Sequence, residues 1–222
     1  RERTAAKLCD FTEMDRCFFV NSGAEANEAA LKTARKATGR TTIVAMEHGF
    51  HGRTMGALGV TWRFREQHQP PHGDVRFVPF GDLAALKDAL DDTVAAVITE
   101  PVQGMAGVVI PPEGWLAGAA ASAHAVGALL IVDEVQSGVG RMGVPLASHL
   151  FGVRPDIATV GKGVGGGFPV AAMLCTEAVA AHIRPGDHGT TFGGAPMACA
   201  AVEVTVDIVC DEELLAKANA VY

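Results

Sequence analysis

The stretch Leu129-Leu-Ile-Val-Asp133-Glu-Val-Gln136 and the later stretch Thr159-Val-Gly-Lys162-Gly-Val-Gly-Gly-Gly167 decide the fold of this chain and point to its chemistry. In the first stretch, an apolar run ends at an aspartate, as a buried strand does when a polar residue follows it. In the second stretch, a lysine lies among glycines, which let the backbone approach a ligand closely. Together they predict a ligand site at the carboxyl edge of a parallel sheet.

The aspartate and the lysine fit one cofactor. Asp133, at the end of a buried strand, can keep the nitrogen of a pyridine ring protonated, which makes the ring an electron sink. The Lys162 amine can form a Schiff base with the carbonyl carbon of the same cofactor. The pair therefore predicts pyridoxal 5′-phosphate. Each residue alone is weak evidence, because a lysine among glycines is usually a solvated turn residue and Asp133 could equally cap a helix.

A phosphate site is predicted where the stretch Asn21-Ser-Gly-Ala-Glu-Ala-Asn-Glu28 follows an apolar run. This stretch predicts the start of a helix, with Ser22 and Glu25 spaced as a capping box. Free backbone N–H groups at a helix N-terminus attract phosphate. We expect Gly23 and Ala24 to give their N–H groups to it, with the Ser22 hydroxyl beside them. A well-capped helix without a ligand is the alternative.

Seven short apolar runs recur along the chain, and most lack the alternation of a strand with one exposed face. They are Cys17–Val20, Thr42–Met46, Val75–Pro79, Val94–Thr99, Leu129–Val132, Ile157–Val160 and Val170–Cys175. Helical stretches lie between them, such as Ala24–Ala37, Asp82–Leu90 and Trp115–Val126. Because this spacing suits crossovers between parallel strands, we predict an α/β fold. Its mostly parallel, doubly wound sheet would have about seven strands and helices on both faces.

Seven motifs, in order and over nearly the whole chain, resemble the class III aminotransferases that depend on pyridoxal phosphate. They are Asn21 to Glu28, Phe50-His-Gly-Arg-Thr54, Glu100-Pro-Val-Gln-Gly104, Asp133 to Arg141, Pro155-Asp156, Gly161-Lys-Gly163 and Gly189-Thr-Thr-Phe-Gly-Gly194. The chain most resembles the acetylornithine and ornithine aminotransferase branch. The resemblance implies that residues 1–222 form the large, cofactor-binding domain of the pyridoxal-phosphate-dependent transferase fold. An N-terminal segment and a C-terminal small domain would then lie outside the chain.

The resemblance also implies roles for individual residues. Asp133 and Lys162 would be catalytic, and Lys162 would also act as the base that moves a proton of the substrate. Arg53 and Thr190 would face the substrate. The residues expected around the cofactor are Ser22, Gly23, Ala24, Phe50, Glu100, Asp133, Glu134, Val135, Gln136, Lys162 and Thr191.

For four of these residues, the resemblance implies which part of the cofactor they would contact. Phe50 would stack on the ring, although it could instead be a core phenylalanine. Val135 would support the other face of the ring, and Gln136 would contact its phenolic oxygen. Thr191 would reach the phosphate across the interface of a homodimer.

The implied activity is transfer of an amino group from an amine or ω-amino acid, such as an acetylornithine-like donor, to a 2-oxo acid such as 2-oxoglutarate. Arginine biosynthesis is the implied pathway. An aminomutase, an epimerase or a decarboxylase of the same fold would keep the same cofactor residues. An inactive, cofactor-binding protein is a third alternative.

Met105 departs from the family pattern, because acetylornithine, ornithine and 4-aminobutyrate relatives usually carry a glutamate there. In those relatives the glutamate pairs with an arginine of the C-terminal domain, which lets one site accept two differently charged substrates. Methionine cannot form that pair. The resemblance therefore predicts the reaction more firmly than the amino donor.

Composition excludes several other classes of protein. Of the 222 residues, 25 are acidic and 18 are basic, giving a net charge of −7, which argues against a nucleic-acid partner. The apolar runs are far shorter than the ~20 residues of a membrane span. His48 and His51 have no third ligand at a useful spacing, so we expect no metal site. The five cysteines lack zinc or redox spacing and suggest reduced thiols in the cytoplasm.

Overall fold

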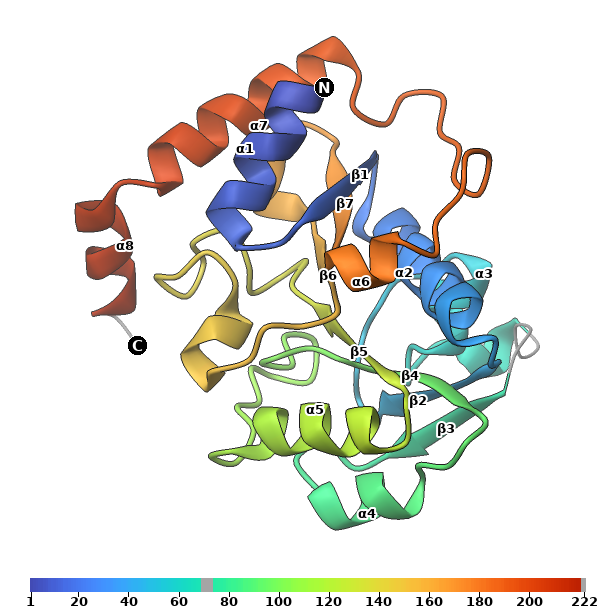
Figure 1. The fold of residues 1–222 in the computed structure, drawn as a ribbon. Coiled ribbons are helices and arrows are strands. Elements are labelled where there is room, and N and C mark those ends of the chain that lie inside the picture. Colours follow the sequence, from blue (N-terminus) through green and yellow to red (C-terminus); the bar gives the residue numbers. More distant parts are fainter. Residues whose placement is uncertain (69–73, 221–222) are drawn as a thin grey trace.

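All seven predicted strands form, and they join in one sheet with the order β1-β7-β6-β5-β4-β2-β3 (Figure 1). The computed structural model describes residues 1–68 and 74–220 of the chain. The strands are β1 (Arg16–Val20), β2 (Thr42–Met46), β3 (Val75–Val78), β4 (Val94–Thr99), β5 (Leu129–Asp133), β6 (Ile157–Val160) and β7 (Ala171–Cys175). Their ends lie within one residue of the predicted apolar runs, so periodicity located the sheet correctly.

The three predicted helices also form, as α2 (Gly23–Thr38), α4 (Leu83–Asp88) and α5 (Trp115–Ala125). The other α-helices are α1 (Glu2–Thr12), α3 (Met55–Gly59), α6 (Glu177–Ala180), α7 (Pro196–Val209) and α8 (Glu212–Asn219). Short 3₁₀ helices are η1 (Arg65–Gln67), η2 (Ala147–Phe151) and η3 (Lys162–Gly165). Among the described residues, no helix is both long and apolar enough to cross a membrane.

Helices cover both faces of the sheet, as its apolar strands require. Every residue of β2, β4, β6 and β7 is buried. On one face, α2 packs against β2, β4, β5, β6 and β7, with Val179 of α6 beside it. On the other face, α4 and α5 pack on β2, β4 and β5, while α1 and α7 pack side by side on β1, β6 and β7 (Figure 1).

One strand runs against the others. β7 is antiparallel to both of its neighbours, β1 and β6, whereas the other strand pairs are parallel. The link from β6 to β7 covers only residues 161–170, which is too short for the crossover of a dozen or more residues that parallel strands need. The chain therefore turns back directly. This short return holds Lys162 at the carboxyl edge of the sheet, close to the end of β5.

Candidate active site

A cavity of about 390 Å³ opens at the carboxyl edge of the sheet, within the size range of small-molecule sites. Strand ends, the N-terminus of α2 and the loops after β2 and β4 form its walls. The residues that line it are Gly23, Ala24, Asn27, Phe50, His51, Gly52, Glu100, Gly104, Met105, Asp133, Val135, Gln136 and Lys162. Eight of the predicted cofactor residues therefore meet in one place.

Lys162 begins η3 with its backbone in the left-handed region, at φ 42°. This conformation is uncommon for a residue with a side chain and is typical of functional sites. The Lys162 amine donates a hydrogen bond to Oε1 of Gln136, which is on the loop after β5. The amine is thus held at the wall of the cavity by a neutral acceptor.

The Asp133 carboxylate forms the floor of the cavity and is only 3% exposed. Its Oδ2 accepts hydrogen bonds from Asn27 Nδ2 and His51 Nδ1, both at 2.8 Å, and its Oδ1 accepts one from the Val135 N–H at 3.0 Å. The Thr159 hydroxyl donates to Asn27 Oδ1 at 2.8 Å. A buried charge is tolerated only when it is paired and hydrogen-bonded, and this network supplies both.

His51 is fully buried beside Asp133, with its side chain 0% exposed. Burial alone would lower the pKa of His51, but the hydrogen bond to Asp133 and the charges of Asp133 and Glu100 outweigh it and raise that pKa. The other ring nitrogen, Nε2, is buried without a hydrogen-bond partner among the described residues. Of the two ring nitrogens only Nδ1 bonds to the floor, while the His51 backbone oxygen accepts a hydrogen bond from Asn27 Nδ2 at 2.7 Å.

Glu100, at the end of β4, ties two loops to the cavity. Its carboxylate accepts hydrogen bonds from the N–H groups of Phe50 at 3.1 Å and Gly104 at 3.2 Å. Burial raises the pKa of Glu100, and the nearby Asp133 charge adds to this effect, whereas His51 and the two amides oppose it. Glu100 therefore places the Phe50 loop over the cavity through backbone contacts.

The N-terminus of α2 forms the predicted capping box. Ser22 is the N-cap, and its hydroxyl accepts a hydrogen bond from the Glu25 N–H at 3.3 Å. The Glu25 carboxylate in turn accepts one from the Asn21 N–H at 3.1 Å. Because its hydroxyl is engaged there, Ser22 does not line the cavity, whereas Gly23 does. A Cβ on Gly23 would lie 2.7 Å from Val135 Cγ1, so only glycine lets the helix approach this closely.

Glu134 does not reach the cavity. Its fully buried carboxylate accepts hydrogen bonds from the Ser137 hydroxyl at 2.6 Å and from the N–H groups of Ala147 at 3.0 Å and Ser148 at 2.7 Å. Burial raises the pKa of Glu134, while these three donors oppose the rise. Its carboxylate anchors the start of η2 and does not line the cavity, so the cofactor contact expected of Glu134 stays a prediction.

The two residues expected to face substrate, and Thr191, also lie outside the cavity. The Arg53 guanidinium lies 4.3 Å from the centroid of the Phe64 ring, which packs edge-on to Phe50. This stacking places Arg53 near the rim. Thr190 and the exposed Thr191 lie between α6 and α7, on the outer side of α2.

Three residues that sequence reasoning did not assign complete the floor: Asn27, His51 and Thr159. Asn27 belongs to the motif Asn21 to Glu28, which assigns it no role of its own. The sequence suggests only a metal-binding role for His51. Thr159 is a polar residue inside the apolar run of β6, and this could have indicated a buried hydrogen bond there. Among the residues that the structure describes, no group of histidine, cysteine and carboxylate side chains is arranged to hold a metal ion.

The donor set fits pyridoxal phosphate. A carboxylate has about four acceptor sites, and three short hydrogen bonds occupy three of those of Asp133. The Thr159 hydroxyl approaches Oδ1 at 3.4 Å, but its single proton has a shorter bond of 2.8 Å to Asn27, so one site is left for a protonated ring nitrogen. The start of α2 offers backbone N–H groups for a phosphate, and Lys162 offers an amine to a carbonyl. The cavity brings all three together.

The chain is similar to known proteins over almost its whole length. The family model described as Aminotransferase class-III matches residues 1–222. The acetylornithine aminotransferase of Methanothermobacter thermautotrophicus is 51% identical over 95% of this chain and 54% of its own length. The [LysW]-aminoadipate semialdehyde/glutamate semialdehyde transaminase of Sulfurisphaera tokodaii is 45% identical over 93% of this chain and 54% of its own length.

A solved structure is similar as well. The taurine:2-oxoglutarate aminotransferase of Bifidobacterium kashiwanohense, in complex with PLP and glutamate, has a TM-score of 0.90 and is 29% identical in sequence. The match covers 97% of this chain and 55% of that chain. The chain spans about half the length of the curated relatives it matches. With a family model matched along its whole length, the chain belongs to the class-III aminotransferase family.

Proposed function

We propose that the protein is an aminotransferase that binds pyridoxal phosphate in this cavity and transfers an amino group to a 2-oxo acid. The observation that carries the proposal is the meeting of the Lys162 amine, the Asp133 carboxylate and the N-terminus of α2 at one cavity. When bound, the cofactor supplies a carbonyl carbon that accepts the amino group and a ring that withdraws electrons. Residues 1–222 would be the cofactor-binding domain of the enzyme.

Each wall of the cavity has a part in holding the cofactor. The N–H groups of Gly23 and Ala24 would bind the phosphate, and Phe50 and Val135 would cover the two faces of the ring. Asp133 would accept a hydrogen bond from the ring nitrogen, a charge-assisted contact of about 1.5–3 kcal/mol. Because Asn27 and His51 already fix this carboxylate, no reorganisation is needed when the ring arrives.

Lys162 would be the base that moves the proton of the substrate. Its Nζ, hydrogen-bonded to the neutral Gln136 amide, would hold the cofactor before substrate arrives and would then take a proton from the substrate as a base. A positioned base typically contributes about 10²–10⁴-fold to the rate. Gln136 would exchange this contact for one to the phenolic oxygen of the cofactor.

For the substrates, we favour an acetylornithine-like ω-amino donor and 2-oxoglutarate as acceptor, in arginine biosynthesis in the cytoplasm. The support is the identity of 51% to an acetylornithine aminotransferase and the likeness to a taurine:2-oxoglutarate aminotransferase. Arg53 and Thr190 would contact the substrate. We further propose a homodimer in which Thr191 binds the phosphate held by the neighbouring subunit.

A half-reaction tests this function. The protein loaded with pyridoxal phosphate is mixed with acetylornithine alone, and a transaminase converts its visible absorbance band to that of pyridoxamine phosphate and releases one oxo product. Addition of 2-oxoglutarate should restore the band. Turnover without pyridoxamine phosphate would indicate a mutase, an epimerase or a decarboxylase, and a band unaffected by any amine would indicate an inactive cofactor-binding protein.

A further inference from the structure

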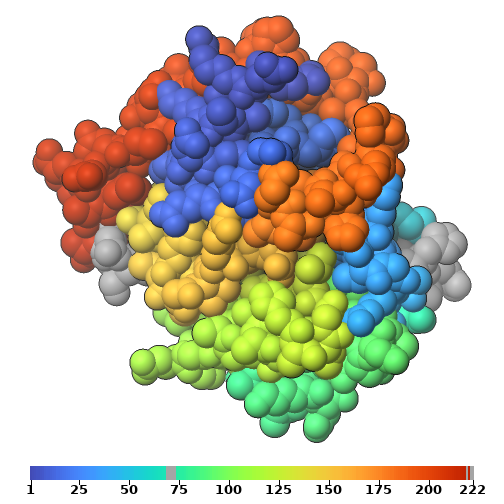
Figure 2. All heavy atoms as spheres, in the orientation of Figure 1, coloured from blue at the N-terminus to red at the C-terminus, as the bar shows by residue number. Residues whose placement is uncertain are grey.

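The segment of residues 181–195, which joins α6 to α7, carries the threonine pair Thr190 and Thr191. Its first half lies directly against α2, and the orange and light-blue atoms meet there in Figure 2. Both threonines lie in a connecting segment, where the hydrogen bonds of a helix or a strand do not fix the backbone. The contacts on either side of the pair, at His188 and Gly193, therefore limit where the two threonines lie.

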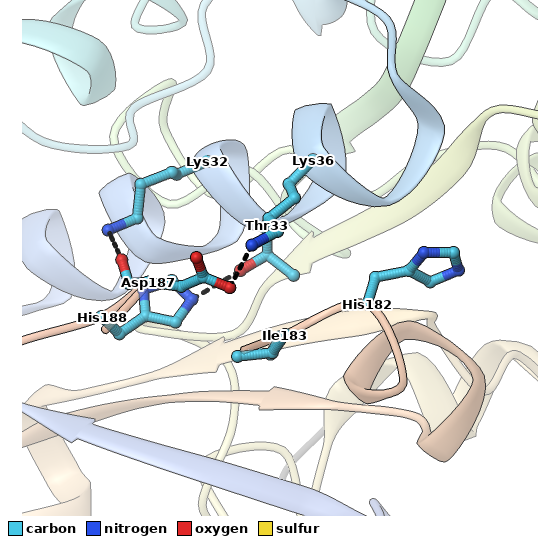
Figure 3. A pocket seen from close by; sticks show the side chains of 7 residues that line it. All are labelled: Lys32, Thr33, Lys36, His182, Ile183, Asp187 and His188. Carbon is cyan, nitrogen blue, oxygen red and sulfur yellow. Dashed lines mark hydrogen bonds and ion pairs between the residues drawn. The ribbon is translucent and has the colours of Figure 1, made fainter. Parts of the chain in front are cut away.

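His188 makes the most buried of these contacts (Figure 3). Its Nε2 shares a hydrogen bond of 3.0 Å with the Thr33 hydroxyl, and Thr33 is only 2% exposed. On its other side, the His188 ring packs against the Phe18 ring of β1, with 4.9 Å between the centroids. One imidazole thus joins the segment to both α2 and β1.

Asp187 adds a second, more exposed attachment to the same helix. Its carboxylate pairs with Lys36, and its backbone oxygen accepts a hydrogen bond from Lys32 Nζ at 2.6 Å (Figure 3). Lys32 and Lys36 are four residues apart, so they share one face of α2. Exposed ion pairs contribute little to stability, and the Lys36 side chain is 41% exposed, so His188 is the stronger anchor.

The far end of the segment is fixed on β1. A Cβ on Gly193 would lie 2.3 Å from the backbone oxygen of Phe19, so this glycine passes in close contact with the strand. The Gly193 N–H also donates a hydrogen bond of 3.1 Å to the Thr190 hydroxyl. Between His188 and Gly193 only residues 189–192 remain, and the two anchors limit where they can go.

We propose that His188 is a positioning residue, which holds Thr191 in the place from which it binds the cofactor phosphate of a neighbouring subunit. This inference rests on the proposed function. Burial, assisted by the Lys32 charge, lowers the pKa of His188, so the ring is neutral at neutral pH. A neutral ring can keep its hydrogen bond to the Thr33 hydroxyl without placing a charge beside Phe18.

The test measures how fast the loaded dimer releases its cofactor after dilution, from the loss of the visible band. The increase in release rate caused by Thr191→Ala is the reference for the other variants. His188→Phe keeps a ring packed on Phe18 but removes the imidazole partner of the hydrogen bond. Thr33→Val removes the hydroxyl partner of the same bond. Each should speed release by about 2- to 12-fold, the range that one intramolecular hydrogen bond spans. The double variant should release no faster than either single variant, because both changes remove the same bond.

Two further variants sharpen the test. His188→Gln, whose amide nitrogen can take the place of Nε2, should recover part of the wild-type retention. His182→Phe is the matched control, since its exposed ring lies in the same segment, and it should release cofactor at the wild-type rate.

The outcomes separate this inference from the function on which it rests. If Thr191→Ala speeds release while His188→Phe and Thr33→Val do not, the positioning role of His188 is wrong and the role of Thr191 stands. If Thr191→Ala changes nothing, both roles are wrong, although the visible band still reports cofactor binding. If the His188 variant releases cofactor only because sedimentation shows that its dimer has dissociated, His188 acts on assembly and the inference is overturned.

Discussion

The floor of the cavity and the segment of residues 181–195 are built in opposite ways. At the floor, Asp133 is buried and receives hydrogen bonds from two other elements of the same chain. In the segment, Thr191 is exposed, and the contacts described above lie on either side of it. The floor is therefore arranged before any ligand arrives. In the proposed homodimer, the segment would bring Thr191 to the phosphate held by the neighbouring subunit.

One helix supports both regions. Asn27, in the first turns of α2, holds Asp133, and Thr33, later in the same helix, holds His188. Because a helix is rigid over this length, the two regions are fixed relative to one another. The comparison therefore leads to a clear expectation: changes at the floor should affect chemistry, whereas changes in the segment should affect retention of the cofactor.

The largest effect is expected at the floor, from Lys162→Ala. Loss of the amine removes both the attachment point of the cofactor and the base, so the rate of amino transfer should fall by at least about 10²–10⁴-fold. Borohydride reduction of the loaded wild-type protein, followed by peptide mapping, should place the cofactor on Lys162. A label on Lys32 or Lys87 would move the chemistry away from the floor and break the comparison.

Asp133→Asn should have the next largest effect. The amide carries no charge to hold the ring nitrogen protonated, so proton abstraction from substrate should slow by more than tenfold, or ~1.4 kcal/mol. Asp156→Asn is a matched control, because Asp156 also bonds a histidine, His124, at 2.7 Å, but precedes β6 at the opposite end of the sheet. Stopped-flow absorbance measures both variants, and equal rates in the two would contradict the electron-sink role of Asp133.

A third test asks whether the floor depends on the charge of His51 or only on its hydrogen bond. His51→Leu leaves Asp133 without one buried partner and should cost about 1–3 kcal/mol of folding stability. His51→Asn keeps a neutral donor in place of Nδ1. Because the folded pKa of His51 is raised, its stabilising contribution is complete below about pH 6.5, the usual value for histidine, and is lost as the pH rises through the folded pKa.

Urea unfolding of the cofactor-free protein at several pH values measures this dependence. The wild type should lose stability relative to His51→Asn as the pH rises above about 6.5. Parallel profiles for the two proteins would show that His51 contributes a neutral hydrogen bond and no charge. The floor would then resemble the segment, where His188 is neutral.

Sequence patterns predicted most of the fold because most residues of its strands are apolar and lack the alternation of a half-exposed strand. The reversed direction of β7 was not assigned, although the short link of residues 161–170 contains that information. At the site, Asp133 and Lys162 could be predicted because Asp133 ends one apolar run and Lys162 follows another by two residues. The sequence places Glu134 beside Asp133 among the cofactor residues. Successive side chains at a strand end point to opposite faces, however, and the Glu134 carboxylate turns toward η2.

The rest of the floor could not be read from local sequence. His51 and Asn27 meet Asp133 from 82 and 106 residues away, through pairing and packing of the whole sheet. No spacing rule connects such distant positions. Thr191 poses the opposite difficulty, because its expected ligand would lie on another subunit and the motif alone carries the prediction.

The smallest effect is expected at the rim of the cavity, from Met105→Glu. The Met105 side chain is 63% exposed, so stability should change by no more than about 0.5 kcal/mol. The resemblance implies that, in relatives with glutamate here, the carboxylate would neutralise an arginine of the C-terminal domain. With methionine, such an arginine would stay available to the carboxylate of each substrate, and an unpaired buried charge would disfavour neutral amines.

The added glutamate should therefore raise kcat/KM for donors without an α-carboxylate, relative to acetylornithine, by a few-fold. Steady-state measurements with acetylornithine, 4-aminobutyrate and a simple neutral amine compare the two proteins, and Val108→Glu, at a similarly exposed position of the same loop, controls for added charge. If the ratios among the three donors stay the same, Met105 contributes only packing. The choice of donor would then depend on Arg53 and Thr190, which both lie outside the floor, so that specificity would be separated from chemistry.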